Sequence, residues 1–388
     1  MNILVISREY PPNTLGGTAT LTKNIHKGLE KLGNNVYVVT TTTNLSTIYE
    51  KNVYAIKVEK TYQNSNQISI EYFKKIQSVM KKYKPDCMIV PDLFSFSEAF
   101  LLSKREAIPL VFVCSQDFRS QSEFNCGIHY VTKNIGANVD YLIEFEKSVF
   151  KRCEAIVYVS DSLKKDMIDL NPLCLNKVIH LGADRDYLEA FNNIDYKKDV
   201  ELISTCARLV PEKGVKYLIQ SMPIILEHNP KIKLSIIGTG TEDEELMDLV
   251  KKLSIKDSVI FHGHIEHEKA LKIMKKSQVG VVTSLWESFC YVAVEYMGLG
   301  TNLVSTDAKS LKEICPPNLV SIVKPSQNKS NKINVDFLAQ CIIDKLKENV
   351  ASNERRIEAQ KYVYEELSNE KFSLKLEKFV EEVIMSNE

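Results

Sequence analysis

VGVVTSLWESFCYVAVEYMGLG, residues 279–300, decides the fold class of this 388-residue chain. It begins with a short apolar run, 279–284, crosses the loop LWESFC and continues from about Phe289 to Leu299 as an apolar helix. An apolar strand that leads into a buried helix is typical of a parallel sheet covered by helices. Its only charges are Glu287 and Glu295, and a buried carboxylate is costly unless it is paired or hydrogen-bonded. The stretch therefore predicts a strand–helix unit that carries two acidic binding residues.

The same alternation occurs in two series along the chain. Strand-like runs lie at 2–7, 36–41, 87–90, 110–114 and 155–160, and again at 202–207, 233–238, 258–261, 279–284 and 301–306. Helical stretches lie between them at 18–32, 71–84, 96–105, 138–152, 213–228, 241–253, 266–276 and 289–299, and three more follow at 333–346, 351–365 and 370–386. The polar, aperiodic segment 181–199 separates the series and is expected to be a linker. The pattern predicts two Rossmann-like domains, residues 1–182 and 183–367.

The amino-acid composition limits the classes of partner and the cellular compartment that are expected for this protein. Fifty basic residues balance fifty acidic ones, so no net charge points to a nucleic-acid partner. Nine scattered cysteines without a C-x-x-C pair indicate reduced thiols in a cytoplasmic protein, and no apolar run is long enough to span a membrane. YFKKIQSVMKKYK (72–84) concentrates lysines in the more basic N-terminal half, which predicts peripheral membrane contact.

Two loops after predicted strands suit phosphate binding, because ligands of parallel sheets bind at the carboxyl ends of strands. Gly16 and Gly17 precede a helix whose N-cap is expected at Thr18 or Thr20, and glycines there let backbone N–H groups approach an anion. In ARLVPEKG, Arg208 and Lys213 flank the start of another helix, an end that disfavours cations. The presence of these two cations is explained if a diphosphate binds between them.

Three further motifs are weaker indications of a ligand-binding or metal-binding site. GTGTED resembles a dinucleotide fingerprint, but Asp243 replaces its third glycine. Asp184-Arg185-Asp186 spells D-x-D within the expected linker, where a metal role is not expected. Three histidines, His262, His264 and His267, have metal-ligand spacing but are expected to be ordinary loop residues.

The chain resembles the retaining nucleotide-sugar glycosyltransferases of family 4, which have the GT-B fold. The resemblance rests on YPPNTLGG, VSDSLKKDM, VIHLGAD, ARLVPEKG, FHGHIEHEKALKIMKKS and the E-x7-E run TSLWESFCYVAVEYMGLG. It implies two Rossmann-like domains that face each other across a cleft, with the C-terminal helix 368–388 returning to the N-terminal domain. It also implies donor-binding roles for Gly16, Gly17, Arg208, Lys213, Glu287, Phe289, Cys290, Tyr291 and Glu295.

Within those roles, the resemblance assigns the diphosphate to Arg208 and Lys213, the ribose hydroxyls to Glu295 and the transferred sugar to Glu287. Four features depart from the family pattern, and one of them is Asn302 in place of a proline. Gln116, before Asp117, stands where a histidine is usual, so both residues are expected near sugar or acceptor. Cys290 replaces the glycine after E-x-F, and the segment STDAKSLKEI lacks the usual Gly-Gly pair.

The expected reaction moves a sugar from a nucleoside diphosphate sugar, such as a UDP-sugar, to an unknown acceptor hydroxyl in glycan, glycolipid or metabolite biosynthesis. Arg208 and Lys213, together with Glu287, form the expected catalytic set, and no metal or cofactor is expected. Two alternatives stay open from the sequence: a sugar-nucleotide epimerase of similar fold, and a catalytically silent partner subunit that binds nucleotide or carbohydrate.

Overall fold

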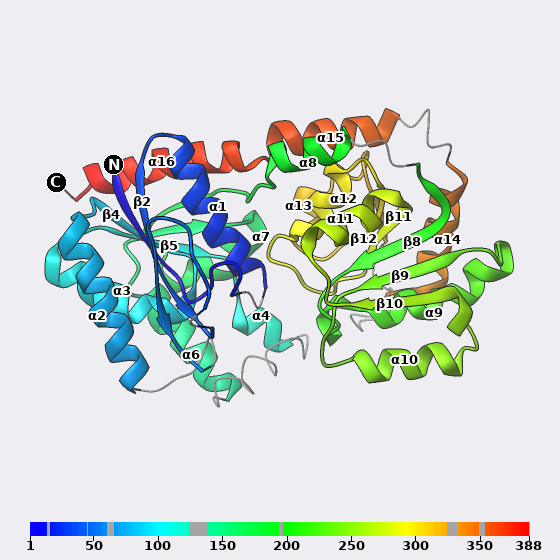
Figure 1. Cartoon of the computed structure of the whole chain (residues 1–388), viewed down its shortest axis with the longest axis horizontal. Helices are drawn as coiled ribbons and strands as arrows, with labels where there is room; N and C mark the ends of the chain where they lie inside the picture. The colour runs from blue at the N-terminus through cyan, green and yellow to red at the C-terminus, as the bar shows by residue number, and fades with distance from the viewer. Residues whose placement is uncertain are drawn as a thin grey trace. The chain divides into compact units, whose positions relative to one another are not determined.

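The structure, a computed structural model, describes residues 1–13, 16–44, 46–59, 66–123, 138–193, 197–323, 333–348 and 354–387 (Figure 1). They form two compact units. Unit 1 holds the described residues of Met1–Ser120, Ile128–Gly182 and Asn369–Glu388, and unit 2 those of Gln121–Gly127 and Ala183–Ser368. Each unit is built around one parallel sheet.

Unit 1 contains a seven-stranded sheet in the order β3-β2-β1-β4-β5-β6-β7. Every pairing in it is parallel. Apart from Asn2 at the start of β1, the central strands are fully buried, as the continuous apolar runs predicted. The strands are β1 (Asn2–Ile6), β2 (Asn35–Thr42), β3 (Val53–Lys57), β4 (Cys87–Val90), β5 (Leu110–Cys114), β6 (Ala155–Tyr158) and β7 (Leu175–Val178). The helices are α1 (Gly17–Lys31), α2 (Asn66–Tyr83), α3 (Phe96–Glu106), α6 (Val139–Phe150), α7 (Asp161–Met167) and α16 (Asn369–Met385), and α4 (Phe118–Glu123) begins in this unit.

The chain returns to unit 1 with its last helix. α16 lies beside α1 (Figure 1) and buries an apolar stripe that includes Phe372, Leu376 and Phe379. Gly28 of α1 permits this approach, because a Cβ atom there would come within 1.8 Å of the Ser373 hydroxyl. The predicted return of the C-terminal helix is therefore confirmed.

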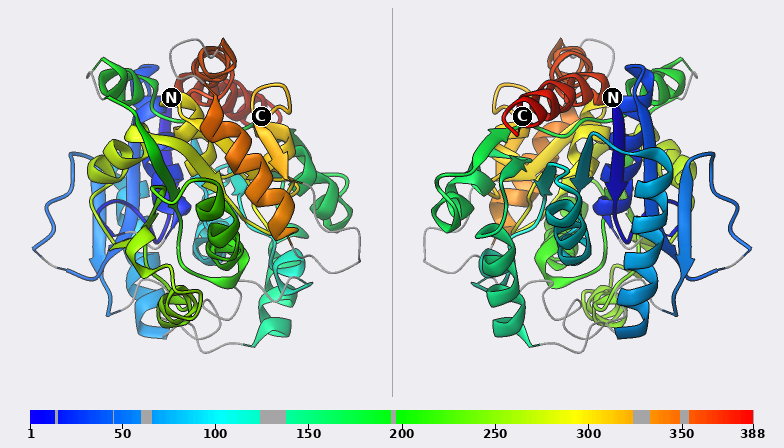
Figure 2. Two further views of the ribbon diagram at one scale, coloured as in Figure 1. Left: turned by 90° about the vertical axis from the view of Figure 1, so that its right-hand side faces the viewer. Right: turned by 90° about the vertical axis from the view of Figure 1, so that its left-hand side faces the viewer.

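Unit 2 contains a six-stranded sheet in the order β10-β9-β8-β11-β12-β13, again wholly parallel. α9 and α14 pack against each other in this unit, where Figure 2 shows α14 in orange. The strands are β8 (Asp199–Cys206), β9 (Lys233–Ile237), β10 (Val259–Gly263), β11 (Ser277–Val282), β12 (Asn302–Thr306) and β13 (Ser321–Val323). The helices are α8 (Arg185–Asn192), α9 (Val215–His228), α10 (Asp243–Lys252), α11 (His267–Lys276), α12 (Tyr291–Gly298), α13 (Leu311–Ile314), α14 (Val335–Lys347) and α15 (Glu354–Glu366).

The expected linker at 181–199 is in part a helix, which corrects the sequence interpretation. α8 occupies its centre and buries Leu188 and Phe191 in unit 2. Its buried side consists of only Leu188 and Phe191, at i and i+3, and the helix has only about two turns, so the periodic stretch is short. Asp184 of the D-x-D sequence caps this helix by accepting a hydrogen bond from the Tyr187 N–H at 3.1 Å, so its carboxylate has a structural role.

Among the described residues, no helix has both the length and the apolar character needed to cross a lipid bilayer. The eight described cysteines are all free thiols. The ninth, Cys126, lies outside the described residues, as do Thr14 and Leu15 of the glycine-containing loop.

Candidate active site

The predicted donor residues of unit 2 gather at one point of its sheet. The strand order places β8 beside β11, with β9 and β10 to one side and β12 and β13 to the other. This is the classic doubly wound order, in which ligands bind where the strand order reverses, outside the carboxyl ends of the two central strands. Arg208 and Lys213 follow β8, and Glu287 and Glu295 follow β11. The topology thus brings together residues that are about 80 positions apart in the chain.

Lys213 ends a single 3-10 turn, Pro211–Lys213, between β8 and α9. The next residue, Gly214, has a φ of +61°, and a Cβ atom there would lie 2.3 Å from the Thr283 carbonyl oxygen. Glycine is required for both reasons. The Thr283 hydroxyl donates to the Lys213 carbonyl oxygen at 2.9 Å, which ties the β8 loop to the β11 loop. Lys213 is therefore held on a rigid turn at the sheet's switch point.

Glu287 is paired with Lys213 in this structure. The Lys213 Nζ atom lies 2.6 Å from Oε1 of Glu287, and the Ser284 hydroxyl donates to the same oxygen at 2.7 Å. The two side chains are only 17% and 9% exposed. Burial alone would lower the pKa of Lys213, but the Glu287 charge raises it above its usual value. The sequence did not predict this pairing, which accounts for one of the two buried carboxylates.

Arg208 is the more exposed of the two cations. Its side chain is 44% exposed, and Nη2 lies 3.6 Å from Oε1 of Glu212, which is 6% exposed. Glu212 was not predicted from the sequence as a site residue. A buried glutamate beside this half-exposed arginine holds the guanidinium near the β8 loop. This arrangement suits recognition of an anionic group.

Glu295 lies in α12, and its partner is a histidine. The His267 Nε2 atom is 2.8 Å from Oε1 of Glu295, and the Glu295 side chain is 15% exposed. His267 starts α11, which agrees with the helix expected at 266–276 and not with a loop position. His262 likewise lies in β10 rather than in a loop, with Nε2 3.0 Å from the Ser235 hydroxyl.

Phe289, Cys290 and Tyr291 lead into α12, which begins at Tyr291 rather than at the expected Phe289. Phe289 is buried, and its ring contacts the Tyr291 ring edge-on at a centroid distance of 5.4 Å. Cys290 is the N-cap and has a φ of +93°, in the left-handed region that favours glycine. Burial raises the pKa of its thiol well above the usual value, and the neighbouring Glu287 charge adds to that effect.

We expect the variant Cys290→Gly to be more stable than the parent protein by about 0.5–1 kcal/mol. Relief of the left-handed strain of about 1–2 kcal/mol outweighs the extra entropy of glycine in the unfolded chain. The free energy of unfolding from urea titration measures the change. Cys206→Gly is the matched control, since Cys206 ends β8 and is not among the residues with positive φ, so that variant should be less stable. A loss of stability in Cys290→Gly equal to that control would contradict the prediction.

In unit 1, Gly16 is the N-cap of α1, so the expected cap at Thr18 or Thr20 was wrong. Thr18 lies inside the helix, where its carbonyl oxygen accepts from the Thr22 hydroxyl at 2.8 Å. Gly16 has an extended φ of −176°, and a Cβ atom there would meet nothing within 4 Å. Neither backbone conformation nor packing therefore requires glycine at this position. Gly16 still lies at the N-terminus of α1, where backbone N–H groups favour an anion.

Gln116 and Asp117 follow β5 and have different environments. Asp117 is fully buried, and its carboxylate accepts hydrogen bonds from the N–H and the hydroxyl of Ser120, in the first turn of α4. Gln116 is half-buried. Of the two candidates for sugar or acceptor contact, only Gln116 has a side chain that is partly open.

Glu146 of α6 is buried in the same region and was not singled out from the sequence. The Phe118 N–H donates to both of its oxygens, at 3.0 and 3.2 Å. Burial raises the pKa of Glu146 to about 8, and the nearby Asp117 charge contributes to the rise. A folded-state pKa above the unfolded value favours folding at low pH, and this contribution is lost as the pH rises toward 8.

We expect the parent protein to lose about 2 kcal/mol more unfolding free energy than Glu146→Gln between pH 6 and pH 8. The variant cannot ionise, whereas Glu146 must lose its proton in a buried site over that range. Urea unfolding at several pH values measures the difference. Glu144→Gln, an exposed position on the same helix, is the control and should follow the parent curve. Parallel curves for the parent and Glu146→Gln would contradict the prediction.

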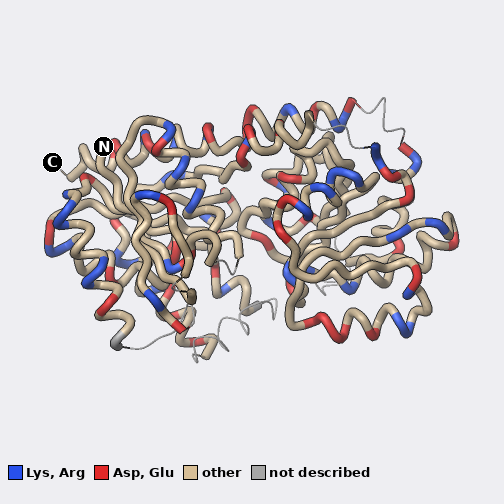
Figure 3. The backbone as a smooth tube through the Cα atoms, in the orientation of Figure 1, with Lys and Arg blue, Asp and Glu red and all other residues tan. Residues whose placement is uncertain are grey.

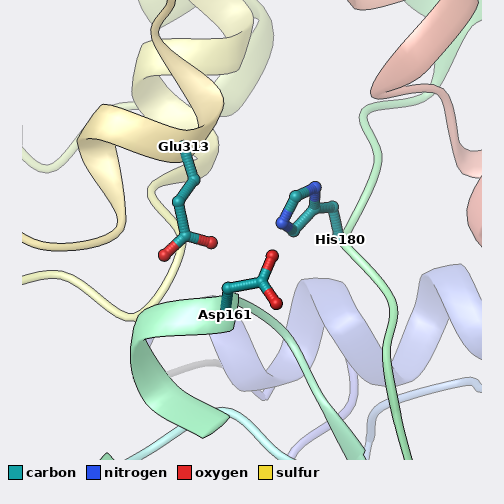
Figure 4. Close-up of side chains that lie close together, drawn as sticks. All are labelled: Asp161, His180 and Glu313. Carbon is teal, nitrogen blue, oxygen red and sulfur yellow. The ribbon is translucent and has the colours of Figure 1, made fainter. Parts of the chain in front are cut away.

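Two motif residues of unit 1 lie together at the carboxyl ends of β6 and β7. Asp161 starts α7, which Ser160 caps, and His180 follows β7. Figure 4 shows their side chains, with one ligand atom of each within 4.8 Å of the other. Zinc sites in proteins use at least three protein ligands, so these two residues of unit 1 do not by themselves make one.

GTGTED also has a structural explanation. Gly238 has a φ of +124°, and Cβ atoms at Gly238 and Gly240 would lie within 2.1 Å of the Ala207 and Leu209 carbonyl oxygens. The glycines allow the loop after β9 to pack on the loop after β8. Asp243, at the third position of the fingerprint, accepts from the Gly240 N–H at 2.7 Å. Acidic residues fill the first turn of α10 and lysines its last turn, as Figure 3 shows.

Comparison with known proteins identifies the family. Residues 186–376 match the family model of glycosyl transferases group 1, and residues 15–187 match that of Glycosyltransferase Family 4. An uncharacterized glycosyltransferase of Methanocaldococcus jannaschii is 28% identical over 95% of this chain and 96% of its own length.

Two solved structures share the fold. Sucrose-phosphate synthase from Thermosynechococcus elongatus has a TM-score of 0.77 at 16% identity, covering 99% of both chains. Anabaena HepE, in complex with UDP and glucose, has a TM-score of 0.75 at 17% identity, covering 98% of this chain and 100% of its own. The chain therefore belongs to the glycosyl transferases group 1 and is a hexosyltransferase-type glycosyltransferase of the GT-B fold.

Proposed function

We propose that the enzyme transfers a hexosyl group from a UDP-sugar to an acceptor hydroxyl with retention of anomeric configuration. The observation that carries this proposal is the meeting of two cations and two carboxylates at the switch point of the unit 2 sheet. A nucleoside diphosphate sugar offers a diphosphate for the cations and sugar hydroxyls for the carboxylates. HepE, of the same fold, was solved with UDP and glucose, which supports UDP as the nucleotide.

The proposed roles of the side chains follow from the charges that develop in the transition state of sugar transfer. As the glycosidic bond breaks, negative charge grows on the leaving diphosphate and positive charge on the sugar ring. Arg208 and Lys213 stabilise the growing negative charge, and a departing phosphate oxygen takes the acceptor proton on the same face. Glu287 contacts the transferred sugar, Glu295 the ribose, and Gln116 tunes the choice of sugar. We propose that these side chains act without a metal ion or cofactor.

A donor panel tests the proposal. The purified chain is incubated with radiolabelled UDP-, ADP- and GDP-hexoses, with and without EDTA, and with simple glycosides and glycolipids as acceptors. Product formation from a UDP-hexose that EDTA leaves unchanged, with the donor's anomeric configuration in the product, is the expected result. Conversion of the donor to another free nucleotide sugar would indicate an epimerase. Nucleotide binding without any turnover would indicate a silent partner subunit.

We further propose peripheral contact with an anionic membrane through α2. One face of this helix is buried through Tyr72, Ile76, Val79 and Met80. Lys74, Lys81 and Lys82 are exposed, Lys75 is half-buried, and Lys84 lies just beyond the helix end. Figure 3 shows the basic positions along α2. Exposed lysines near a surface of anionic lipid each contribute about 1 kcal/mol to binding.

We expect the triple variant Lys74→Glu, Lys81→Glu, Lys82→Glu to bind anionic vesicles at least about tenfold more weakly than the parent protein. Co-sedimentation with phosphatidylglycerol vesicles measures the change. Reversing Lys251 and Lys252 at the end of α10 is the control and should leave binding unchanged. Equal binding to vesicles with and without anionic lipid would contradict the proposal.

A further inference from the structure

We propose that His267 is a positioning residue, which orients the Glu295 carboxylate toward the ribose hydroxyls of the donor nucleotide. This inference rests on the proposed function, because it takes Glu295 as the ribose ligand. It assigns a role in donor binding to a histidine that lies outside the E-x7-E run.

The first observation is the direct contact. Nε2 of His267 lies 2.8 Å from Oε1 of Glu295. A carboxylate only accepts hydrogen bonds, so the imidazole Nε2–H is the donor and the ring tautomer at this contact is defined. A carboxylate offers about four lone-pair positions on its two oxygens, so one bond from an imidazole leaves capacity for two adjacent ribose hydroxyls.

The second observation is that the imidazole is itself held in place. Its ring stacks on Tyr187 with a centroid distance of 5.8 Å and an interplanar angle of 22°. Tyr187 lies in the first turn of α8, and its N–H donates to the capping Asp184 carboxylate. A chain of contacts therefore runs from the cap of α8 through Tyr187 and His267 to Glu295.

The third observation is that the side chains of His267 and Glu295 differ in solvent exposure. The His267 side chain is 58% exposed and the Glu295 side chain only 15% exposed. A glutamate has three side-chain torsions, and fixing its carboxylate before the nucleotide arrives lowers the entropy cost of binding. The more exposed imidazole supplies this restraint from the solvent side of the carboxylate.

The test measures nucleotide binding and so does not require an acceptor. UDP, ADP, GDP and CDP are titrated by calorimetry, and the best ligand is then compared with its 2′,3′-dideoxy analogue. Fluorescence of Trp286, the single tryptophan, gives an independent readout beside Glu287. We expect His267→Ala to raise the Kd of the ribonucleotide about 3- to 10-fold, the size of one net hydrogen bond, and to leave that of the dideoxy analogue unchanged.

Three further variants sharpen the test. His267→Gln should recover most of the affinity, because its amide N–H can replace Nε2–H. His228→Ala, at the exposed end of α9, is the matched control and should bind like the parent protein. In a Glu295→Ala background, His267→Ala should have no further effect. Once a donor is identified, His267→Ala should raise the donor KM and leave kcat within about twofold.

The outcomes separate this inference from the proposed function. The role of His267 would be overturned if His267→Ala bound the ribonucleotide as tightly as the parent protein or more tightly, or if it lost equal affinity for the dideoxy analogue. In that case a clear loss of affinity in Glu295→Ala would still support the ribose contact. Unchanged binding by Glu295→Ala would overturn the ribose assignment and the inference that rests on it. If none of the four nucleotides binds, the proposed function and the inference both fall.

Discussion

Replacing Arg208 with alanine should lower kcat about 100- to 1,000-fold, roughly 2.7–4 kcal/mol, and change the donor KM much less. The guanidinium would meet charge that grows only as the diphosphate leaves, so its removal raises the energy of the transition state more than that of the bound donor. Steady-state rates with the donor selected by the panel measure both constants. The protein should still fold, because the Arg208 side chain is 44% exposed and its loss removes no core volume, although the buried Glu212 loses its ion-pair partner and some stability is lost with it.

The variant Arg208→Lys distinguishes the effect of the positive charge on kcat from that of the guanidinium geometry. A lysine keeps the positive charge but loses the two-point grip of the guanidinium, so an intermediate rate is expected. Glu295→Ala provides the contrast, since ribose contacts are made equally before and during the reaction and should change mainly the donor KM. Turnover by Arg208→Ala at near the parent rate, in protein with an unchanged circular dichroism spectrum, would show that this part of the sheet edge does not bind a diphosphate.

Lys213→Met should lower the free energy of unfolding by about 3 kcal/mol, and Glu287→Leu should have a similar effect. Each single change leaves the other partner buried and unpaired, and broken buried ion pairs cost about 3–5 kcal/mol. The lower end applies because Lys213 and Glu287 retain 17% and 9% exposure. The double variant Lys213→Met, Glu287→Leu should recover most of the loss, since no unpaired charge remains.

The Lys213–Glu287 ion pair also affects the interpretation of kcat in a Lys213 variant. A Lys213→Ala enzyme loses a cation and also leaves Glu287 unpaired beside the proposed sugar position, so its loss of kcat combines two effects. We expect the double variant to be stable and inactive, which separates folding from chemistry. The exposed pair Lys251–Asp248 is the control, and Lys251→Met should unfold like the parent protein. Additive losses in the double variant would show that the two residues do not stabilise each other.

Much of the fold could be predicted from the sequence because the central strands are buried on both faces. Continuous apolar runs such as 87–90 and 110–114 belong to the middle of a sheet and were correctly placed. The three strands that were missed, β3, β7 and β13, all lie at sheet edges. An edge strand has a neighbour on one side only and is partly exposed, so its residues need not form an apolar run.

The sheet edge that carries the charged candidates could also be predicted, because Arg208, Lys213 and Glu287 lie in loops after strands and Glu295 lies in the helix that follows one of those loops. Their partners could not. Lys213 meets Glu287, 74 residues away, and Glu295 meets His267, 28 residues away. The left-handed backbone of Cys290 is another feature that only the structure reveals. Local sequence determines which residues stand at the end of a strand, whereas the pairing of side chains depends on which strands become neighbours, and that is decided when the whole sheet forms.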